Sequence, residues 1–250
     1  MKIYQDMIFY LSVPKCVCCK ERLDKDDRAL CKKCRIEYKN LLERNCSICS
    51  KRLNECSCSN KHLDSHFVHK LIKVFRYRTG EINPANALLY SLKKDNRHDV
   101  LDALADELYS SITLSVKEPE NYLFTSVPRR RAAIIEYGID HAELLARKVA
   151  KKCNAAYKKT LISLSKTEQK KSKNREERIK GLNFKVRNIN LEKQNVILID
   201  DIVTTGASMA TAATLLKGCG AKNIIGASLA IAYKDTYTPF EIGDRFAPQK

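Results

Sequence analysis

The sequence lacks any long hydrophobic run and has far fewer acidic than basic residues, 29 Asp and Glu against 46 Lys and Arg. In 250 residues, no apolar stretch approaches the roughly 20 residues of a transmembrane helix. Residues 7–13 form too short an apolar segment for a secretory signal and lack its small-residue cleavage site. Hydrophobic residues still make up 44% of the chain, which supports a real core and excludes wholesale disorder. We therefore expect a soluble, intracellular protein with no transmembrane segment.

After residue 58, cysteine is almost absent from the chain. Nine of the eleven cysteines lie in that first part, and only Cys153 and Cys219 follow. A disulfide framework needs an oxidising compartment, and nothing in the sequence directs the chain to one. The clustering therefore predicts a separate small module that binds metal.

The spacing of these cysteines is typical of zinc ribbons, since three CxxC pairs are followed by one CxC pair. Two residues between thiolates let one turn aim both sulfurs at an ion, and two such turns complete a four-thiolate site. The simplest pairing predicts two tandem ribbons and up to two structural zinc ions, whereas an interleaved pairing also fits the spacing. The predicted ligands are Cys16, Cys19, Cys31 and Cys34 for one site and Cys46, Cys49, Cys56 and Cys58 for the other.

Alternatives stay open within this module. Cys18 is the spare thiol, although the run from Cys16 to Cys19 leaves open which two of its three cysteines bind. A nearby histidine could replace a weak ligand, namely His62, His66 or His69. A closed four-thiolate site has no open position for substrate, which favours a structural zinc over a catalytic or redox one. Ahead of the module, residues 3–11 predict a short packing helix rather than a membrane anchor, because its polar face is poor in Lys and Arg.

From about residue 66 the chain alternates between strand-like and helix-like segments. Strands are expected at 74–78, 122–127, 196–199 and 223–233, and helices at 84–92, 99–112, 141–152 and 209–217. This alternation predicts an α/β fold in which helices cover both faces of a parallel sheet.

Candidate ligand-binding side chains are concentrated between residues 196 and 208, whose sequence is VILIDDIVTTGAS. A buried strand ends in two carboxylates, Asp200 and Asp201, at the edge where open α/β sheets bind ligands. The acids can hold sugar hydroxyls or a hydrated Mg²⁺. The following turn can cradle one phosphate through its backbone N–H groups, its hydroxyls and the helix dipole. The predicted phosphate-binding residues are Thr204, Thr205, Gly206, Ala207 and Ser208.

This segment resembles the phosphoribosyl-diphosphate (PRPP) binding motif of the type I phosphoribosyltransferases. The resemblance implies that the acids bind ribose hydroxyls, that the loop binds the 5-phosphate, and that Mg²⁺ accompanies PRPP in a Rossmann-like fold. In that family a loop after an earlier strand meets the pyrophosphate, and guanidinium groups suit that task. The corresponding residues here are Val127, Pro128, Arg129 and Arg130. A solvated arginine run is the alternative, and it applies more to Arg131 than to Arg129 and Arg130.

Together with the cysteine module, the chain resembles the ComF competence family. Further matching segments are Phe75-Arg76-Tyr77, the arginines after Pro128, residues 137–146, Thr167 with Gln169, and Arg178. The resemblance implies a bacterial cytoplasmic protein that handles single-stranded DNA in natural transformation, near the inner face of the membrane and with a helicase partner. The expected organisation is a packing helix at 1–15, a double zinc ribbon at 16–62, a phosphoribosyltransferase-like domain at 66–236 and a tail at 237–250.

Positive charge gathers in one part of this expected domain. The chain has 46 Lys and Arg against 29 Asp and Glu, a net charge of +17, and residues 151–195 alone carry +10. We expect a basic flap at about 155–193 that attracts phosphates or nucleic acid, with Tyr137, Tyr157 and Phe184 available to stack on bases. A plainly solvated basic surface is the alternative.

Two functions are compatible with these sequence features. The favoured one is a competence-type DNA-handling protein that binds PRPP or a nucleotide-like ligand. The alternative is an active Mg²⁺-dependent transferase that moves ribose 5-phosphate to a nitrogen nucleophile. Thr204 stands where purine-salvage relatives have a proton-accepting Asp, which disfavours an oxopurine substrate. Asp140 and His141 are expected to cap and start a helix, or to contact a base.

Overall fold

The computed structural model describes residues 14–46, 48–130, 134–136, 138–164, 184–187 and 189–233. Several expectations lie outside these residues: the helix at 3–11, the tail at 237–250, residues 165–183 and 188 of the basic flap, and individual motif residues. Those residues are Arg131, Tyr137, Thr167, Gln169 and Arg178.

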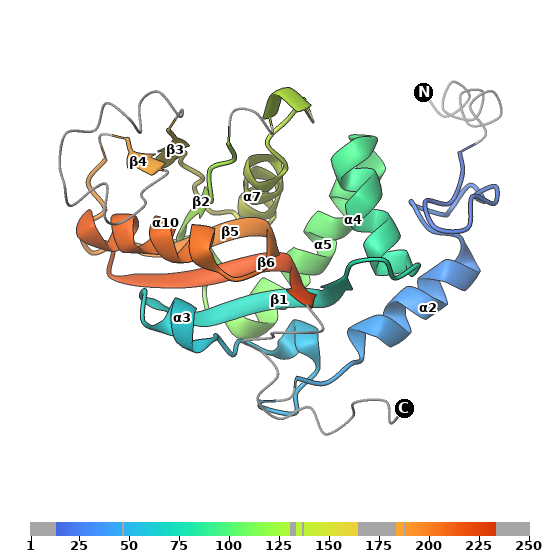
Figure 1. Ribbon diagram of the computed structural model, residues 1–250, viewed down its shortest axis with the longest axis horizontal. Helices are drawn as coiled ribbons and strands as arrows, with labels where there is room; N and C mark the ends of the chain where they lie inside the picture. The colour runs from blue at the N-terminus through green and yellow to red at the C-terminus, as the bar shows by residue number, and fades with distance from the viewer. Residues whose placement is uncertain are drawn as a thin grey trace.

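A four-stranded parallel sheet forms the centre of the fold, with strand order β1-β6-β5-β2 (Figure 1). Its strands are β1 (Val68–Arg78), β2 (Leu123–Ser126), β5 (Asn195–Val203) and β6 (Asn223–Tyr233). Strand β5 lies between β6 and β2, and its residues 196–199 are fully buried. A continuous apolar run is what a strand covered on both faces requires. The expectation of a parallel sheet is confirmed.

Helices cover both faces of this sheet, as expected. Helices α4 (Pro84–Lys94), α5 (His98–Ser115) and α7 (His141–Lys152) pack on one face, and α10 (Ala207–Gly218) packs on the other with the short α3 (Lys61–Asp64) (Figure 1). Side chains cap several of these helices. Asn83 precedes Pro84 in the first turn of α4 and its side chain accepts the Asn86 N–H at 2.8 Å.

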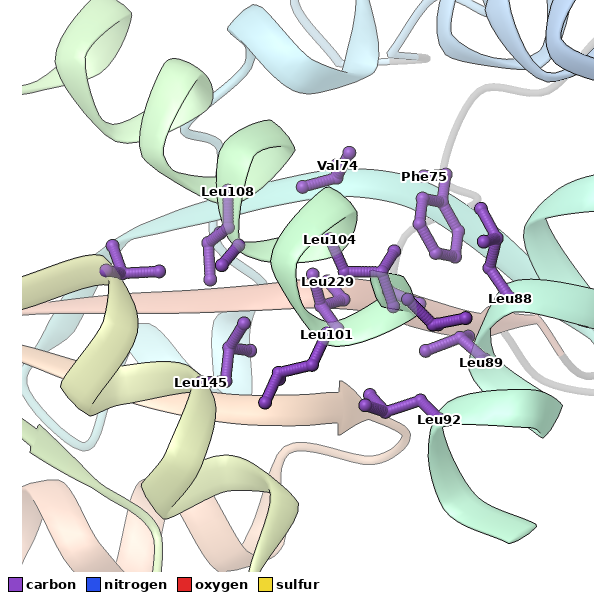
Figure 2. Close-up of a cluster of buried hydrophobic side chains, with 14 of the residues drawn as sticks. Val74, Phe75, Leu88, Leu89, Leu92, Leu101, Leu104, Leu108, Leu145 and Leu229 are labelled. Atoms are coloured by element: carbon purple, nitrogen blue, oxygen red, sulfur yellow. The ribbon is translucent and has the colours of Figure 1, made fainter. Parts of the chain in front are cut away.

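Leucines fill the space between the sheet and the first group of helices (Figure 2). Leu88, Leu104 and Leu145 come from α4, α5 and α7, and they pack over Phe75 of β1 and Leu229 of β6. All five side chains are at most 2% exposed. This layer holds the carboxyl ends of the strands in place, where the predicted site lies.

Three features were not expected from the sequence. Strand β1 begins at Val68, six residues before the predicted start, because it pairs with β6 along almost its whole length. A helix, α2 (Lys32–Leu42), runs inside the cysteine module. Its buried residues Cys34, Tyr38 and Leu42 are spaced at four-residue intervals, a helical signal that the CxxC pattern obscured. A small antiparallel pair, β3 (Leu161–Ser163) and β4 (Phe184–Val186), lies inside the region predicted as a flap at about 155–193.

Among the described residues, no helix is both long enough and apolar enough to span a bilayer.

Candidate phosphate-ligand site and metal clusters

The acid pair lies at the carboxyl end of the central strand β5. The Oδ1 atom of Asp201 accepts the N–H of Ile202 at 2.7 Å, and that of Asp200 accepts the N–H of Asp201 at 2.9 Å. Asp201 is only 9% exposed, whereas Asp200 is more accessible. The strand therefore presents one buried and one more accessible carboxylate side by side.

Two cations neutralise Asp201. Its Oδ2 atom lies 3.2 Å from Lys93 Nζ on α4 and 3.5 Å from Arg129 Nη1 in the loop after β2. Burial alone would raise the pKa of Asp201, but these cations outweigh burial and lower it. Burial, and after it the charge of Asp201, raise the pKa of Asp200 well above its usual value. The two carboxyl groups therefore titrate apart, and Asp201 carries the negative charge.

Arg129 is held by a chain of partly buried hydrogen bonds. Its Nη1 atom lies 2.8 Å from His141 Nδ1, and His141 Nε2 lies 2.9 Å from Asn96 Oδ1. A guanidinium group can only donate, so Nδ1 accepts and Nε2 carries the proton that is donated to Asn96. Burial, followed by the charge of Arg129, lowers the pKa of His141 and keeps the ring neutral. His141 therefore orients Arg129 as well as starting α7.

The predicted phosphate loop joins β5 to α10. Gly206 is the N-cap of the helix and has a φ of 83°, a left-handed conformation that favours glycine. The hydroxyl of Thr205 accepts the N–H of Ala207 at 3.4 Å. Thr204, Thr205 and Ser208 are exposed, so their hydroxyls are available to a ligand. The loop encloses a small hollow of about 50 Å³ at the positive end of the helix dipole.

One cleft of about 250 Å³ unites the predicted groups. Residues from both loops and from the acid pair line it, together with Phe184 of β4, which lies within the region predicted as a flap. The lining is Val127, Pro128, Arg129, Arg130, Ala142, Phe184, Asp200, Asp201, Ile202 and Ser208. Asp200 also lines the smaller phosphate-loop hollow, so the two spaces adjoin. Carboxylate oxygens are suitable ligands for a Mg²⁺ ion that keeps several waters and binds substrate phosphates.

Sequence reasoning missed Lys93 and Asn96 in this site. Both belong to the region around the end of α4, more than 100 residues from Asp201 in the chain. Lys93 and Lys94 are adjacent lysines at the end of an apolar helix, where cations are common for the helix dipole alone. Only the folded contact distinguishes Lys93 from its neighbour.

The cysteines form two groups of four, in the simplest pairing that the sequence offered. In each group the four sulfur atoms lie within 4.8 Å of one another. A tetrahedral zinc site with Zn–S bonds of about 2.3 Å places sulfurs about 3.8 Å apart. Cys19 Sγ and Cys31 Sγ are 3.6 Å apart, so the donor set fits zinc. We call residues 16, 19, 31 and 34 the first cluster and residues 46, 49, 56 and 58 the second cluster.

The other candidate ligands, Cys18 and the three histidines, lie outside both clusters. Cys18 belongs to neither cluster, and the clusters found in the described part of the chain contain cysteine alone. The rings of His62 and His66 contact each other at a tilt of 54°, and His69 pairs with Asp64. Either cluster could hold a zinc ion whose four thiolates leave no position for substrate.

Comparison with known proteins supports the α/β domain. Residues 137–243 match the family model for the phosphoribosyl transferase domain, so this part of the chain is phosphoribosyltransferase-like. The match covers α7, β5, the acid pair, the phosphate loop and α10. No curated protein matches the chain.

Solved structures give more distant likenesses. A purine phosphoribosyltransferase from Pyrococcus horikoshii is 16% identical, with a TM-score of 0.34, over 52% of this chain and 72% of that chain. An adenine phosphoribosyltransferase is 18% identical, with a TM-score of 0.33, over 54% and 69%. A Leishmania tarentolae enzyme solved with GMP is 10% identical, with a TM-score of 0.33, over 61% and 80%.

Proposed function

We propose that the cleft binds PRPP, or a related ribose 5-phosphate ligand, together with Mg²⁺. The observation that carries this proposal is the convergence of two carboxylates, two arginines and a hydroxyl-bearing helix N-terminus on adjoining hollows. The Thr204–Ser208 loop would hold the 5-phosphate. Asp200 and Asp201 would hold the ribose hydroxyls or the hydrated metal ion, and the Val127–Arg130 loop would face the diphosphate.

Ligand binding would rearrange the charges around Asp201. Without ligand, Lys93 and Arg129 both neutralise this carboxylate. Mg²⁺, when bound, supplies positive charge to the acids and to the diphosphate. Arg129 would then be available to the diphosphate, with His141 and Asn96 keeping its guanidinium directed into the cleft. Arg130 is already exposed there.

Isothermal titration with Mg²⁺–PRPP tests this proposal. We expect the wild type to bind, and the Asp200→Asn/Asp201→Asn double variant to lose affinity at least about 100-fold, since charge-assisted contacts are lost. Asp24→Asn is the matched control, because Asp24 is an exposed acid that pairs with Lys32 and does not line the cleft. Equal affinities of the double variant and the wild type would sink the site assignment.

We further propose that the biological role is DNA handling of the ComF competence type, in which single-stranded DNA is passed on with a helicase partner. The net charge of +17 supports an anionic macromolecular partner. Among the described residues, Lys158, Lys185 and Arg187 are exposed cations around the β3–β4 pair. Lys185 directly follows Phe184, which lines the cleft and could stack on a base.

Fluorescence anisotropy with single-stranded DNA at two salt concentrations tests this role. Binding should weaken as salt rises, because phosphate contacts release counterions. The triple variant Lys158→Ala/Lys185→Ala/Arg187→Ala should bind more weakly and with a smaller salt dependence. Absence of DNA binding by the wild type at low salt would exclude the role.

Catalysis is the alternative function of the same cleft. A nitrogen nucleophile would form a bond to C1 of the ribose, and the C1–O bond to pyrophosphate would break. Pyrophosphate leaves with the bonding electron pair, and the nitrogen loses a proton to solvent. Arg129 and Arg130 could stabilise the leaving group. Release of pyrophosphate from PRPP in the presence of a base or amine would establish the enzyme.

A further inference from the structure

The second cluster is built directly onto the edge strand of the sheet. Cys58 forms a β-bridge with Lys70, and the N–H of Leu71 donates to the carbonyl of Ser57 at 3.0 Å. Lys73, two residues further along β1, is 1% exposed. Its ammonium group lies 3.2 Å from Cys56 Sγ and 2.8 Å from the Cys58 carbonyl. Strand β1 therefore contributes a buried cation to the cluster.

This cation fits a metal-bound cluster. A buried ammonium group is costly unless it is paired with negative charge and hydrogen-bonded. Four thiolates around one Zn²⁺ carry a net charge of −2, so the cluster supplies that negative charge when it holds metal. Lys73 is the only charged residue among the fully buried side chains of the described residues. In the sequence, this buried lysine is visible only as a single charge between Ile72 and Val74 in an otherwise apolar stretch.

The same cluster leads into the helix that supports the phosphate loop. Asn60 follows Cys58 by two residues and caps α3, accepting the N–H of Leu63 at 2.7 Å. Leu63 is fully buried and packs over Gly206. A Cβ atom placed on Gly206 would lie 3.0 Å from Leu63 Cγ and Cδ2, closer than ordinary van der Waals contact. Leu63 therefore fills the space that a side chain at the loop's glycine would need.

The first cluster makes no comparable connection in the described structure. Cys16, Cys31 and Cys34 belong to the hydrophobic core under α4 and α5. Cys46, Cys56 and Leu63 belong to the core on the opposite face, together with Met209 and Ala210 of α10. The buried cysteines of the two clusters therefore belong to different hydrophobic cores.

We propose that the second cluster is a metal-dependent support of the phosphate loop. With metal bound, the cluster and Lys73 fix the start of α3, and α3 holds Leu63 against Gly206. Leu63 is thus a positioning residue for the ligand of the proposed function, on which this inference rests. Loss of the metal loosens α3 and lowers the affinity of the loop for its phosphate.

Paired cysteine variants test the coupling. Cys58→Ser disables the second cluster, and Cys19→Ser is the matched control in the first cluster. Zinc per chain is measured by mass spectrometry, and the affinity for Mg²⁺–PRPP by titration. Each variant should lose one zinc ion. Only Cys58→Ser should lose affinity, roughly tenfold, a size usual for coupling between sites. Unchanged affinity in Cys58→Ser, or equal losses in both variants, would overturn the proposal.

Leucine variants keep the test decisive if Cys58→Ser fails to fold. Leu63→Ala should keep its zinc and lose affinity for Mg²⁺–PRPP roughly tenfold. Leu216→Ala truncates a buried leucine of the same core at the far end of α10 and should bind as the wild type does. Equal binding by both leucine variants would contradict the positioning role.

Hydrogen exchange separates this inference from the proposed function. If wild-type protein does not bind PRPP, the proposed ligand is wrong but the support can still be measured. Amides of residues 204–208 should exchange faster in Cys58→Ser and in Leu63→Ala than in Cys19→Ser. Identical exchange rates in all three variants would reject the coupling, whatever the ligand.

Discussion

The two cysteine clusters have the same four-thiol composition but different surroundings. The first cluster packs beside α2 and the helices on one face of the sheet. The second is joined to β1 by backbone hydrogen bonds and leads through α3 to the phosphate loop. One ligand motif can therefore serve local folding in one place and support a ligand-binding loop in another.

The cations beside the clusters differ in the same way. Lys20 near the first cluster is exposed and donates to the carbonyl of Val17 at 2.9 Å. Lys73 beside the second cluster is buried and donates to a cysteine sulfur. An exposed charge is solvated by water, whereas a buried one depends on its partners. Substitution of each lysine therefore measures how far the cluster is tied to the rest of the fold.

We expect Lys73→Met to have the largest effect. It leaves the negative charge of a metal-bound cluster without its buried partner, and removal of one partner of a buried pair costs about 3 kcal/mol or more. Lys20→Met is the matched control and should cost less than about 0.5 kcal/mol. Chemical denaturation of the zinc-loaded proteins measures both. Similar losses for the two variants would remove the distinction between the clusters.

The helix caps provide a smaller test of the connection to the site. Asn60→Ala removes the cap of α3, and Asp140→Ala removes the cap of α7, which accepts the N–H of Glu143 at 3.1 Å. Each change should cost about 1 kcal/mol in the free energy of unfolding. Only Asn60→Ala should speed hydrogen exchange at residues 204–208, because only α3 leads to Gly206. Faster exchange there in both variants would show a general loosening instead.

Local patterns in the sequence predicted much of this architecture. The apolar run before Asp200 identified the central strand, and the cysteine spacing identified both clusters. The bounds of α7 and β6 agree with those expected. Each of these signals lies within a few residues of the chain, as does the match between Gly206 and a left-handed turn.

Contacts between distant segments could not be predicted in this way. Leu63 and Gly206 are separated by 143 positions, and neither residue alone indicates the other. Lys93 resembles an ordinary helix-ending lysine until folding brings it to Asp201. Tertiary packing assigns these roles, so residue spacing gives no periodic signal for them.

Protonation of His141, which contacts Arg129 in the cleft, should make the stability of the fold depend on pH. This effect should be independent of the second cluster. The lowered pKa of His141 means that the unfolded chain, with a histidine pKa of about 6.5, binds a proton that the folded chain resists. Stability should therefore fall as the pH drops below about 6.5. Denaturation at pH 7.5 and 5.5 should show a smaller loss for His141→Gln than for the wild type. Equal losses would contradict the neutral role of this ring beside Arg129.

Tyr38 gives the smallest expected effect and tests the first cluster alone. It lies on α2, is 5% exposed, and packs edge-on against Phe75 with ring centroids 6.0 Å apart. Among the residues that the structure describes, none forms a hydrogen bond with its hydroxyl. An unsatisfied buried hydroxyl destabilises the fold, so Tyr38→Phe should leave stability unchanged or raise it by up to about 1 kcal/mol.

Tyr38→Leu is the control for this change, because it also removes the aromatic pair and should cost about 1 kcal/mol. Thermal or chemical denaturation compares the two variants. Both should bind Mg²⁺–PRPP as the wild type does, since α2 packs on the face opposite the phosphate loop. A loss of affinity in Tyr38→Leu would mean that the first cluster's helix also reaches the site, and the contrast between the two clusters would then fail.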